Sequence, residues 1–136
     1  LTPMSAQPFA IPITVEPADI DFMGHVNNAR YLTWVQEAVL AHWRKLAPAE
    51  DVAGKAWVAL KHEITYLRPG FLGDAVIAAP VLESFKGARA FYKTVISRGE
   101  EVLAEVRSAW CCIDAETLKP ARIGEHLRGF FNVSAD

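Results

Sequence analysis

Cysteine, excess positive charge and long apolar runs are all scarce in this sequence. The two cysteines, Cys111 and Cys112, are adjacent, and neighbouring cysteines make at best a strained bridge, so neither a disulfide framework nor a zinc cluster is expected. Free thiols are typical of the reducing cytoplasm. The formal net charge of −2 argues against a nucleic-acid partner. No apolar run approaches the roughly 20 residues that cross a bilayer and no secretory signal is recognisable, so no membrane partner is expected.

What is present is the composition of a folded domain. The 136 residues are 51% hydrophobic and 22% charged, which is typical of a globular protein and not of a disordered one. The length suits one domain with a substantial core, and no repeat, low-complexity tract or linker divides the chain. We therefore expect a single domain over residues 1–136, with residues 1–10 as a loose N-terminal arm.

The hydrophobic pattern predicts one long helix among strands. Over residues 28–46, apolar side chains cover most of the helical circumference and leave a narrow polar stripe, which is typical of a buried helix. The stripe consists of Arg30, Thr33, Glu37 and Arg44. Alternating apolar and polar residues between turn formers predict strands. The predicted strands are 11–17, 56–67, 74–86, 89–98 and 101–113, and a short C-terminal helix is predicted over 121–131.

These elements predict an α+β fold. The last four strands are long and their connections are short, which favours an antiparallel meander. One sheet of about five strands must then wrap around one helix. Pro80 is expected at a bulge or an edge, because proline cannot donate a ladder hydrogen bond. The outer face and an edge of such a sheet need cover, and a homodimer that continues the sheet would provide it.

The densest polar cluster, residues 19–28, lies between the first predicted strand and the start of the helix. A helix N-terminus offers unpaired N–H groups and a partial positive charge, which can stabilise a developing oxyanion. A carboxylate from Asp19 or Asp21 could activate water or attack a carbonyl itself. Gly24 would let the backbone approach a ligand closely. The cluster therefore predicts an acyl-transfer site that needs no serine or cysteine nucleophile.

Simpler structural explanations compete with this prediction. Asp19 and Asp21 also suit turns or caps, and as a cation site they lack a third ligand, so neither a metal nor a cofactor is expected. His25 suits a hydrogen-bonded turn as well as a catalytic role. Asn27 and Asn28 are suited to cap the first helical turn.

Three motifs carry a resemblance to a known family. The first reads Asp19-x-Asp21-x-x-Gly24-His25-Val26-Asn27-Asn28-x-x-Tyr31, with Glu37 further along the helix. The second comprises Ile64-x-Tyr66-Leu67-Arg68-Pro69-Gly70 and Gly73-Asp74, and the third is Lys119-Pro120-x-x-Ile123. Together they resemble the hotdog-fold acyl-CoA thioesterases, most closely the 4-hydroxybenzoyl-CoA thioesterase type.

The resemblance implies a hotdog fold, in which an antiparallel five-stranded sheet wraps around one long central helix. It implies hydrolysis of an acyl-CoA to a free acid and CoA, with Asp21 as nucleophile or general base. Backbone N–H groups near Asn28 would polarise the thioester carbonyl, and His25 would orient the site or assist proton transfer. The residues implied to contact the substrate are Gly24, Asn27 and Tyr31. The active site would lie at the interface of a homodimer or of a dimer of dimers.

Two alternatives remain open at this point. A related stretch occurs in plant-type acyl-ACP thioesterases, but these have an asparagine where this chain has Met23, and two hotdog domains where it has one. Hydrolysis of an acyl-ACP would need a docking patch, for which Lys86, Arg89 and Lys93 are candidates. The second alternative is a non-catalytic acyl-CoA-binding module, although a pure binder has no need of Asp21.

Overall fold

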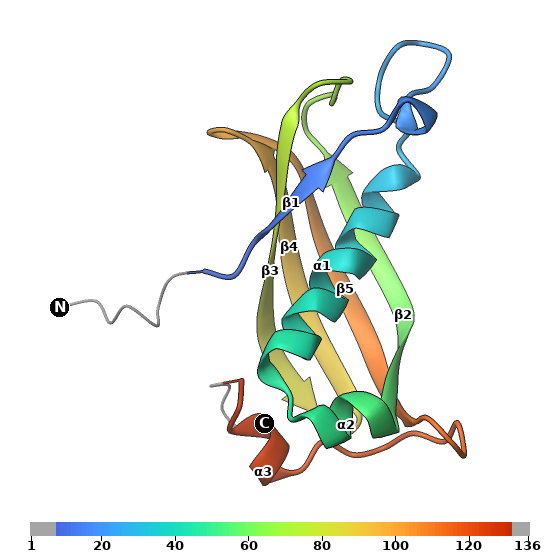
Figure 1. The fold of residues 1–136 in the computed structure, drawn as a ribbon, viewed down its shortest axis with the longest axis vertical. Coiled ribbons are helices and arrows are strands. Elements are labelled where there is room, and N and C mark those ends of the chain that lie inside the picture. The colour runs from blue at the N-terminus through green and yellow to red at the C-terminus, as the bar shows by residue number, and fades with distance from the viewer. Residues whose placement is uncertain (1–7, 132–136) are drawn as a thin grey trace, which may run out of the picture.

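The structure is a computed structural model that describes residues 8–131. Most of the predicted N-terminal arm, residues 1–7, lies outside the described residues. One long helix, α1 (Arg30–Leu46), lies across a curled antiparallel sheet (Figure 1). The five strands are β1 (Ile11–Thr14), β2 (Lys55–Tyr66), β3 (Ala75–Lys86), β4 (Arg89–Arg98) and β5 (Glu101–Asp114). The predicted fold class is confirmed, and most strand boundaries agree within one residue.

The order of the strands in the sheet corrects the prediction of a simple meander. The order is β1-β3-β4-β5-β2, so β3, β4 and β5 follow one another, but β2 pairs with β5 and not with β3. The connection over residues 67–74 must therefore pass from one side of the sheet to the other. It is long enough, since an extended residue spans about 3.4 Å and neighbouring strands lie about 4.8 Å apart. This crossing places residues 67–74 over the end of the molecule where α1 begins (Figure 1).

Helix α1 buries one face against the sheet and presents the predicted polar stripe to solvent. Val35 and Ala38 are fully buried, whereas Thr33 and Glu37 are exposed. The helix begins at Arg30, two residues later than predicted. The reason is that Asn27 forms a turn before the helix, in which its side-chain Oδ1 accepts the N–H of Ala29 at 3.0 Å.

Two short helices were missed, and one was predicted too long. The 3-10 helix η2 (Pro17–Asp19) forms because proline begins it and the Glu16 and Asp19 side chains cap it reciprocally. Helix α2 (Ala49–Gly54) starts directly after Pro48, with acidic side chains in its first turn. Helix α3 (Glu125–Arg128) is a single turn, shorter than the predicted 121–131.

Pro80 lies at an edge position of β3 and not at its bulge. The register of β3 with β4 shifts between Leu82 and Ser84, while Pro80 pairs regularly opposite Thr94. On its other side β3 pairs with β1 only over Ala75–Ala78, so Pro80 lies where β3 has no second neighbour. Proline, which lacks a backbone N–H, is tolerated at such an edge position.

Strand β2 forms the opposite edge of the sheet and borders only β5. Its outward side chains Val58 and Leu60 are 44% and 48% exposed.

Both cysteines are free thiols, with Cys112 buried and Cys111 partly so. Burial raises the pKa of the Cys112 thiol to about 11. Among the described residues, no helix is both long and apolar enough to cross a bilayer.

Candidate active site

A closed loop over residues 20–26 leads into helix α1. Ile20 and Val26 form an isolated antiparallel bridge, and the Asp21 N–H donates to the His25 carbonyl at 2.8 Å. Gly24 has φ +84°, a left-handed conformation that glycine adopts without the steric cost of a Cβ atom. The loop is therefore tied across its base, and its two polar side chains of interest, Asp21 and His25, are held near the start of α1.

The two aspartates have different surroundings. Asp19 is only 5% exposed, and both of its carboxylate oxygens are engaged. One oxygen pairs with the Arg30 guanidinium at 2.7 Å, and the other accepts the Glu16 N–H at 2.8 Å. Asp21 is half-buried, and its Oδ1 accepts the N–H groups of Met23 and His25 at 2.9 and 3.2 Å. Its Oδ2 has no partner among the described residues, so this oxygen is available to a ligand.

The start of α1 leaves a backbone donor available. The Asn28 N–H has no acceptor within the part of the chain that the structure describes. The Asn28 carbonyl is held in place from the other side, because it accepts the Tyr66 hydroxyl at 2.8 Å. The positive end of a 17-residue helix dipole lies at the same place. An unpaired N–H here is suited to bind a developing negative charge.

The segment after β2 approaches this loop closely. The Val26 N–H donates to the Gly70 carbonyl at 2.8 Å. A Cβ atom on Gly70 would lie 3.0 Å from the Tyr31 hydroxyl and 3.2 Å from the Val26 side chain, so any larger residue here would crowd both. Tyr31 is buried, and burial raises its pKa, against the opposing effect of a backbone hydrogen bond from Gly70.

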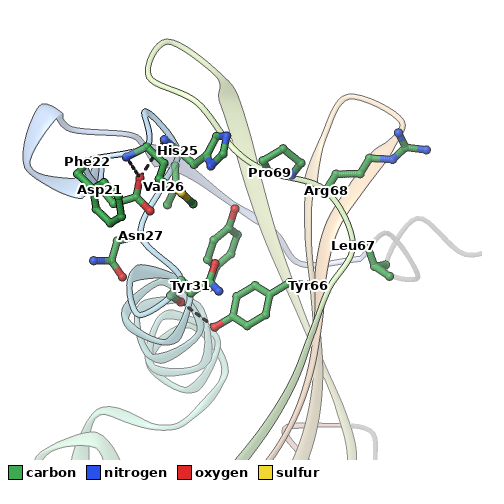
Figure 2. A pocket seen from close by; sticks show the side chains of 12 residues that line it. Asp21, Phe22, His25, Val26, Asn27, Tyr31, Tyr66, Leu67, Arg68 and Pro69 are labelled. Carbon is green, nitrogen blue, oxygen red and sulfur yellow. Dashed lines mark hydrogen bonds between the residues drawn. The ribbon is translucent and has the colours of Figure 1, made fainter.

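These elements enclose an open pocket of about 550 Å³ (Figure 2). In Figure 2, Asp21 lies on one side of the pocket and Tyr66 on the other, with Tyr31 between them. His25 is half-buried, and its ring meets the Phe71 ring edge to face at 5.5 Å. The lining residues are Asp21, Phe22, Met23, His25, Val26, Asn27, Asn28, Tyr31, Tyr66, Leu67, Arg68 and Pro69.

The structure brings most of the predicted site residues together. Of the predicted catalytic residues, Asp21, His25 and Asn28 all line this pocket. Of the predicted substrate-contacting residues, Asn27 and Tyr31 line it, whereas Gly24 lies in the loop but does not line the pocket. The chemical roles of these residues stay predictions.

The second wall of the pocket, Tyr66 to Pro69, was given no role from the sequence. The family motif contains these residues, and that motif was the one available signal. Their contact with Asn28 joins positions 38 residues apart, which no local pattern reveals.

The fold and this pocket define a class of protein. A long helix wrapped by a curled antiparallel sheet is the hotdog fold, which solved thioesterase structures share. A thioesterase from Thermus thermophilus, in complex with coenzyme A and Zn, has TM-score 0.80 at 23% identity, over 91% of this chain and 97% of that one. A probable thioesterase from Bartonella henselae has TM-score 0.75 at 27% identity, over 87% and 98% of the respective chains.

Sequence comparison gives the family. The model of the thioesterase-like superfamily matches residues 15–131. The long-chain acyl-CoA thioesterase FadM of Escherichia coli (strain K12) is 30% identical over 123 residues, which is 85% of this chain and 91% of that protein. This chain belongs to the thioesterase-like superfamily, and the resemblance inferred from its motifs is confirmed.

Proposed function

We propose that this protein hydrolyses acyl-CoA thioesters to a free carboxylic acid and CoA, with Asp21 as the reacting carboxylate. The observation that carries the proposal is one pocket lined by both Asp21, with its free Oδ2, and Asn28, with its free N–H. Family membership and the 30% identical relative named a long-chain acyl-CoA thioesterase support the same reaction. Long-chain acyl-CoAs are therefore the first substrates to test.

Asp21 acts in one of two ways. As a general base, it takes a proton from water while the water oxygen attacks the thioester carbonyl. As a nucleophile, its Oδ2 attacks the carbonyl and forms an anhydride, which water then hydrolyses. In both routes the carbon–sulfur bond breaks, the CoA thiolate leaves and takes up a proton, and the acid is released. The two N–H donors on Oδ1 hold the carboxylate and leave Oδ2 free in either case.

The start of α1 acts as the oxyanion site. The Asn28 N–H donates to the carbonyl oxygen as negative charge develops on it, and the helix dipole adds to this stabilisation. The Tyr66 hydroxyl holds the Asn28 carbonyl and so fixes the orientation of the adjoining peptide. His25 orients the site or assists proton transfer. Asn27 and Tyr31 contact the substrate, and Gly24 allows the loop to fold close to it.

We further propose a homodimer, or a dimer of dimers, that completes the site along the β2 edge. Two outward side chains of β2 support this assembly, because Val58 and Leu60 are 44% and 48% exposed at this edge. A second copy would cover this apolar surface. The 12 residues of β2 also present an unpaired ladder edge.

The test is CoA release from a panel of short, medium, long and aromatic acyl-CoAs, with Asp21→Asn measured beside the wild type. We expect the substitution to lower kcat by about 10²–10⁴-fold, which is the usual contribution of a general base. The fold should be retained, because an asparagine Oδ1 can still accept the Met23 and His25 N–H groups. Released CoA is detected with a thiol-reactive reagent. The signal that Cys111 and Cys112 give with this reagent is measured on protein without substrate and subtracted.

Near-normal turnover by Asp21→Asn would contradict the assignment of this carboxylate. If no acyl-CoA is cleaved, the same acyl groups are tested on acyl carrier protein, and turnover there would favour the acyl-ACP thioesterase. Tight acyl-CoA binding without any product would instead favour the non-catalytic binding module.

A further inference from the structure

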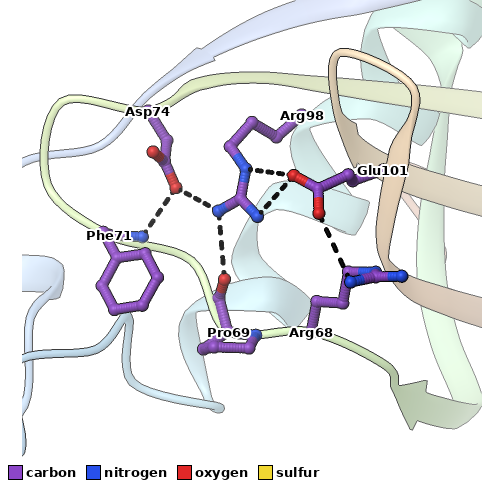
Figure 3. A network of polar contacts seen from close by, with 6 residues as sticks. All are labelled: Arg68, Pro69, Phe71, Asp74, Arg98 and Glu101. Carbon is purple, nitrogen blue, oxygen red and sulfur yellow. Dashed lines mark hydrogen bonds and ion pairs between the residues drawn. The ribbon is translucent and has the colours of Figure 1, made fainter.

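Outside the pocket, one arginine binds segment 69–74, which begins at Pro69, the last residue of the second wall. Arg98 ends β4, and its guanidinium reaches three groups in two directions (Figure 3). Its Nη1 donates to the Asp74 carboxylate at 2.7 Å and to the Pro69 carbonyl at 3.1 Å. Its Nε and Nη2 donate to one oxygen of Glu101 at 3.3 and 3.0 Å. The planar fork therefore joins both ends of segment 69–74 to the β4–β5 hairpin.

Segment 69–74 in turn makes two contacts with the loop that carries Asp21. The first runs through the backbone, where the Gly70 carbonyl next to Pro69 accepts the Val26 N–H at 2.8 Å. The second runs through Phe71, whose N–H donates to Asp74 at 2.8 Å and whose ring meets the His25 ring at 5.5 Å. Fixing Pro69 and Asp74 therefore fixes the two residues that contact the Asp21 loop.

The fit around Gly70 leaves little room for displacement. Even a Cβ atom there would lie 3.0 Å from the Tyr31 hydroxyl, so the segment already packs at contact distance. Released from Arg98, segment 69–74 would lose two of the hydrogen bonds that hold it in this position. A shift of about 1 Å at a reacting group can cost about 10²-fold in rate.

We propose that Arg98 is a positioning residue, which holds segment 69–74 so that Gly70 and Phe71 keep the Asp21–His25 loop in its reactive geometry. This inference rests on the proposed hydrolysis, but Arg98 itself does not line the pocket. Arg68 extends the network through a 3.4 Å ion pair with Glu101 at the exposed rim, where pairs contribute little. The positioning contacts are those to Asp74 and Pro69.

The experiment compares Arg98→Met and Arg98→Lys with Arg107→Met. Arg107 is the matched control, because it forms a 2.7 Å ion pair with Glu83 on the same sheet, away from the pocket. We expect Arg98→Met to lower kcat about 10- to 100-fold while KM changes less than about threefold. Arg98→Lys should recover part of kcat, because lysine keeps the charge but lacks the planar fork. Arg107→Met should keep kcat within about twofold of wild type.

A second measurement, hydrogen exchange of the Val26 amide in the unliganded protein, does not depend on turnover. We expect exchange at Val26 to be at least about tenfold faster in Arg98→Met and unchanged in Arg107→Met. If the wild type hydrolyses no acyl-CoA, the proposed function fails. The exchange rate of Val26 would still show whether Arg98 holds segment 69–74 against the Asp21–His25 loop. The positioning role of Arg98 would be overturned if the Arg98 variants kept the kcat and the Val26 exchange rate of the wild type. It would also be overturned if Arg107→Met changed kcat and Val26 exchange as much as Arg98→Met does. If Arg98→Met does not fold, Arg98→Lys decides by the same two criteria.

Discussion

At the scale of single residues, Asp19 and Asp21 show how surroundings separate two identical side chains. They are two positions apart in one motif, yet Asp19 is buried with both oxygens engaged, while Asp21 keeps one oxygen free at a pocket. A carboxylate with every oxygen bound is suited to structure, and one with a free oxygen is suited to chemistry. Because the partners of Asp19 include Arg30 on α1, its role is to join η2 to the start of that helix.

This difference predicts that the same substitution lowers stability by different amounts at the two positions. Asp19→Asn should lower the free energy of unfolding by about 2 kcal/mol, because it weakens at once the ion pair of a buried carboxylate with the partly exposed Arg30 and the cap of η2. Asp21→Asn should cost about 1 kcal/mol or less, because its hydrogen bonds to Met23 and His25 use an oxygen that asparagine keeps. Urea unfolding of the two variants checks this. Equal losses of stability would contradict the division of roles.

At the scale of elements, the alternation of residues within a segment predicts a strand, but it does not predict which strands pair. Ala104, Val106 and Ser108 alternate along β5 and are all buried, so the sequence alone was sufficient to predict that strand and its inner face. The position of β2 beside β5 depends on contacts between distant segments, which no local pattern contains. The same reason explains what could be predicted of the site. Residues 19–31 are contiguous and were recognised as one motif, whereas the contact of Tyr66 with Asn28 joins distant positions and could not be predicted.

One polar contact crosses between the two layers, where His42 on α1 meets the Tyr92 hydroxyl on β4 at 2.8 Å. Burial lowers the pKa of His42, so the folded protein favours the neutral imidazole. The stability that this preference contributes is fully present above pH of about 6.5 and is lost as the pH falls through the lowered folded pKa. Acidification should therefore loosen the contact between helix and sheet.

We expect wild-type stability to fall between pH 7.5 and 5.5, and His42→Gln to reduce that fall by up to about 1.4 kcal/mol, the limit for one group with an unfolded pKa of about 6.5. Exposed His126 provides the control, and His126→Gln should keep the wild-type pH dependence. Urea unfolding at the two pH values measures the difference. The explanation fails if His42→Gln and the wild type lose stability equally on acidification.

At the scale of the whole molecule, the two edges of the sheet differ. Strand β1 is short and the adjacent part of β3 carries Pro80, so that edge discourages further pairing. The β2 edge is 12 residues long, borders only β5 and has exposed Val58 and Leu60. A second copy paired along β2 would give hydrogen-bond partners to the unpaired backbone groups of this edge and would cover Val58 and Leu60. The proposed dimer is placed there for this reason.

The proposed assembly predicts that Val58→Glu combined with Leu60→Glu converts a dimer into monomers, because like charges would face each other across the new interface. Sedimentation velocity measures the change. Val81→Glu is the control, since Val81 is similarly exposed at 52% but lies on β3, and it should leave the β2-paired dimer intact. Because the site is proposed at the interface, kcat/KM should fall at least about tenfold with dissociation and recover partly at high protein concentration. A monomeric wild type, or a fully active monomeric variant, would remove the second subunit from the active site.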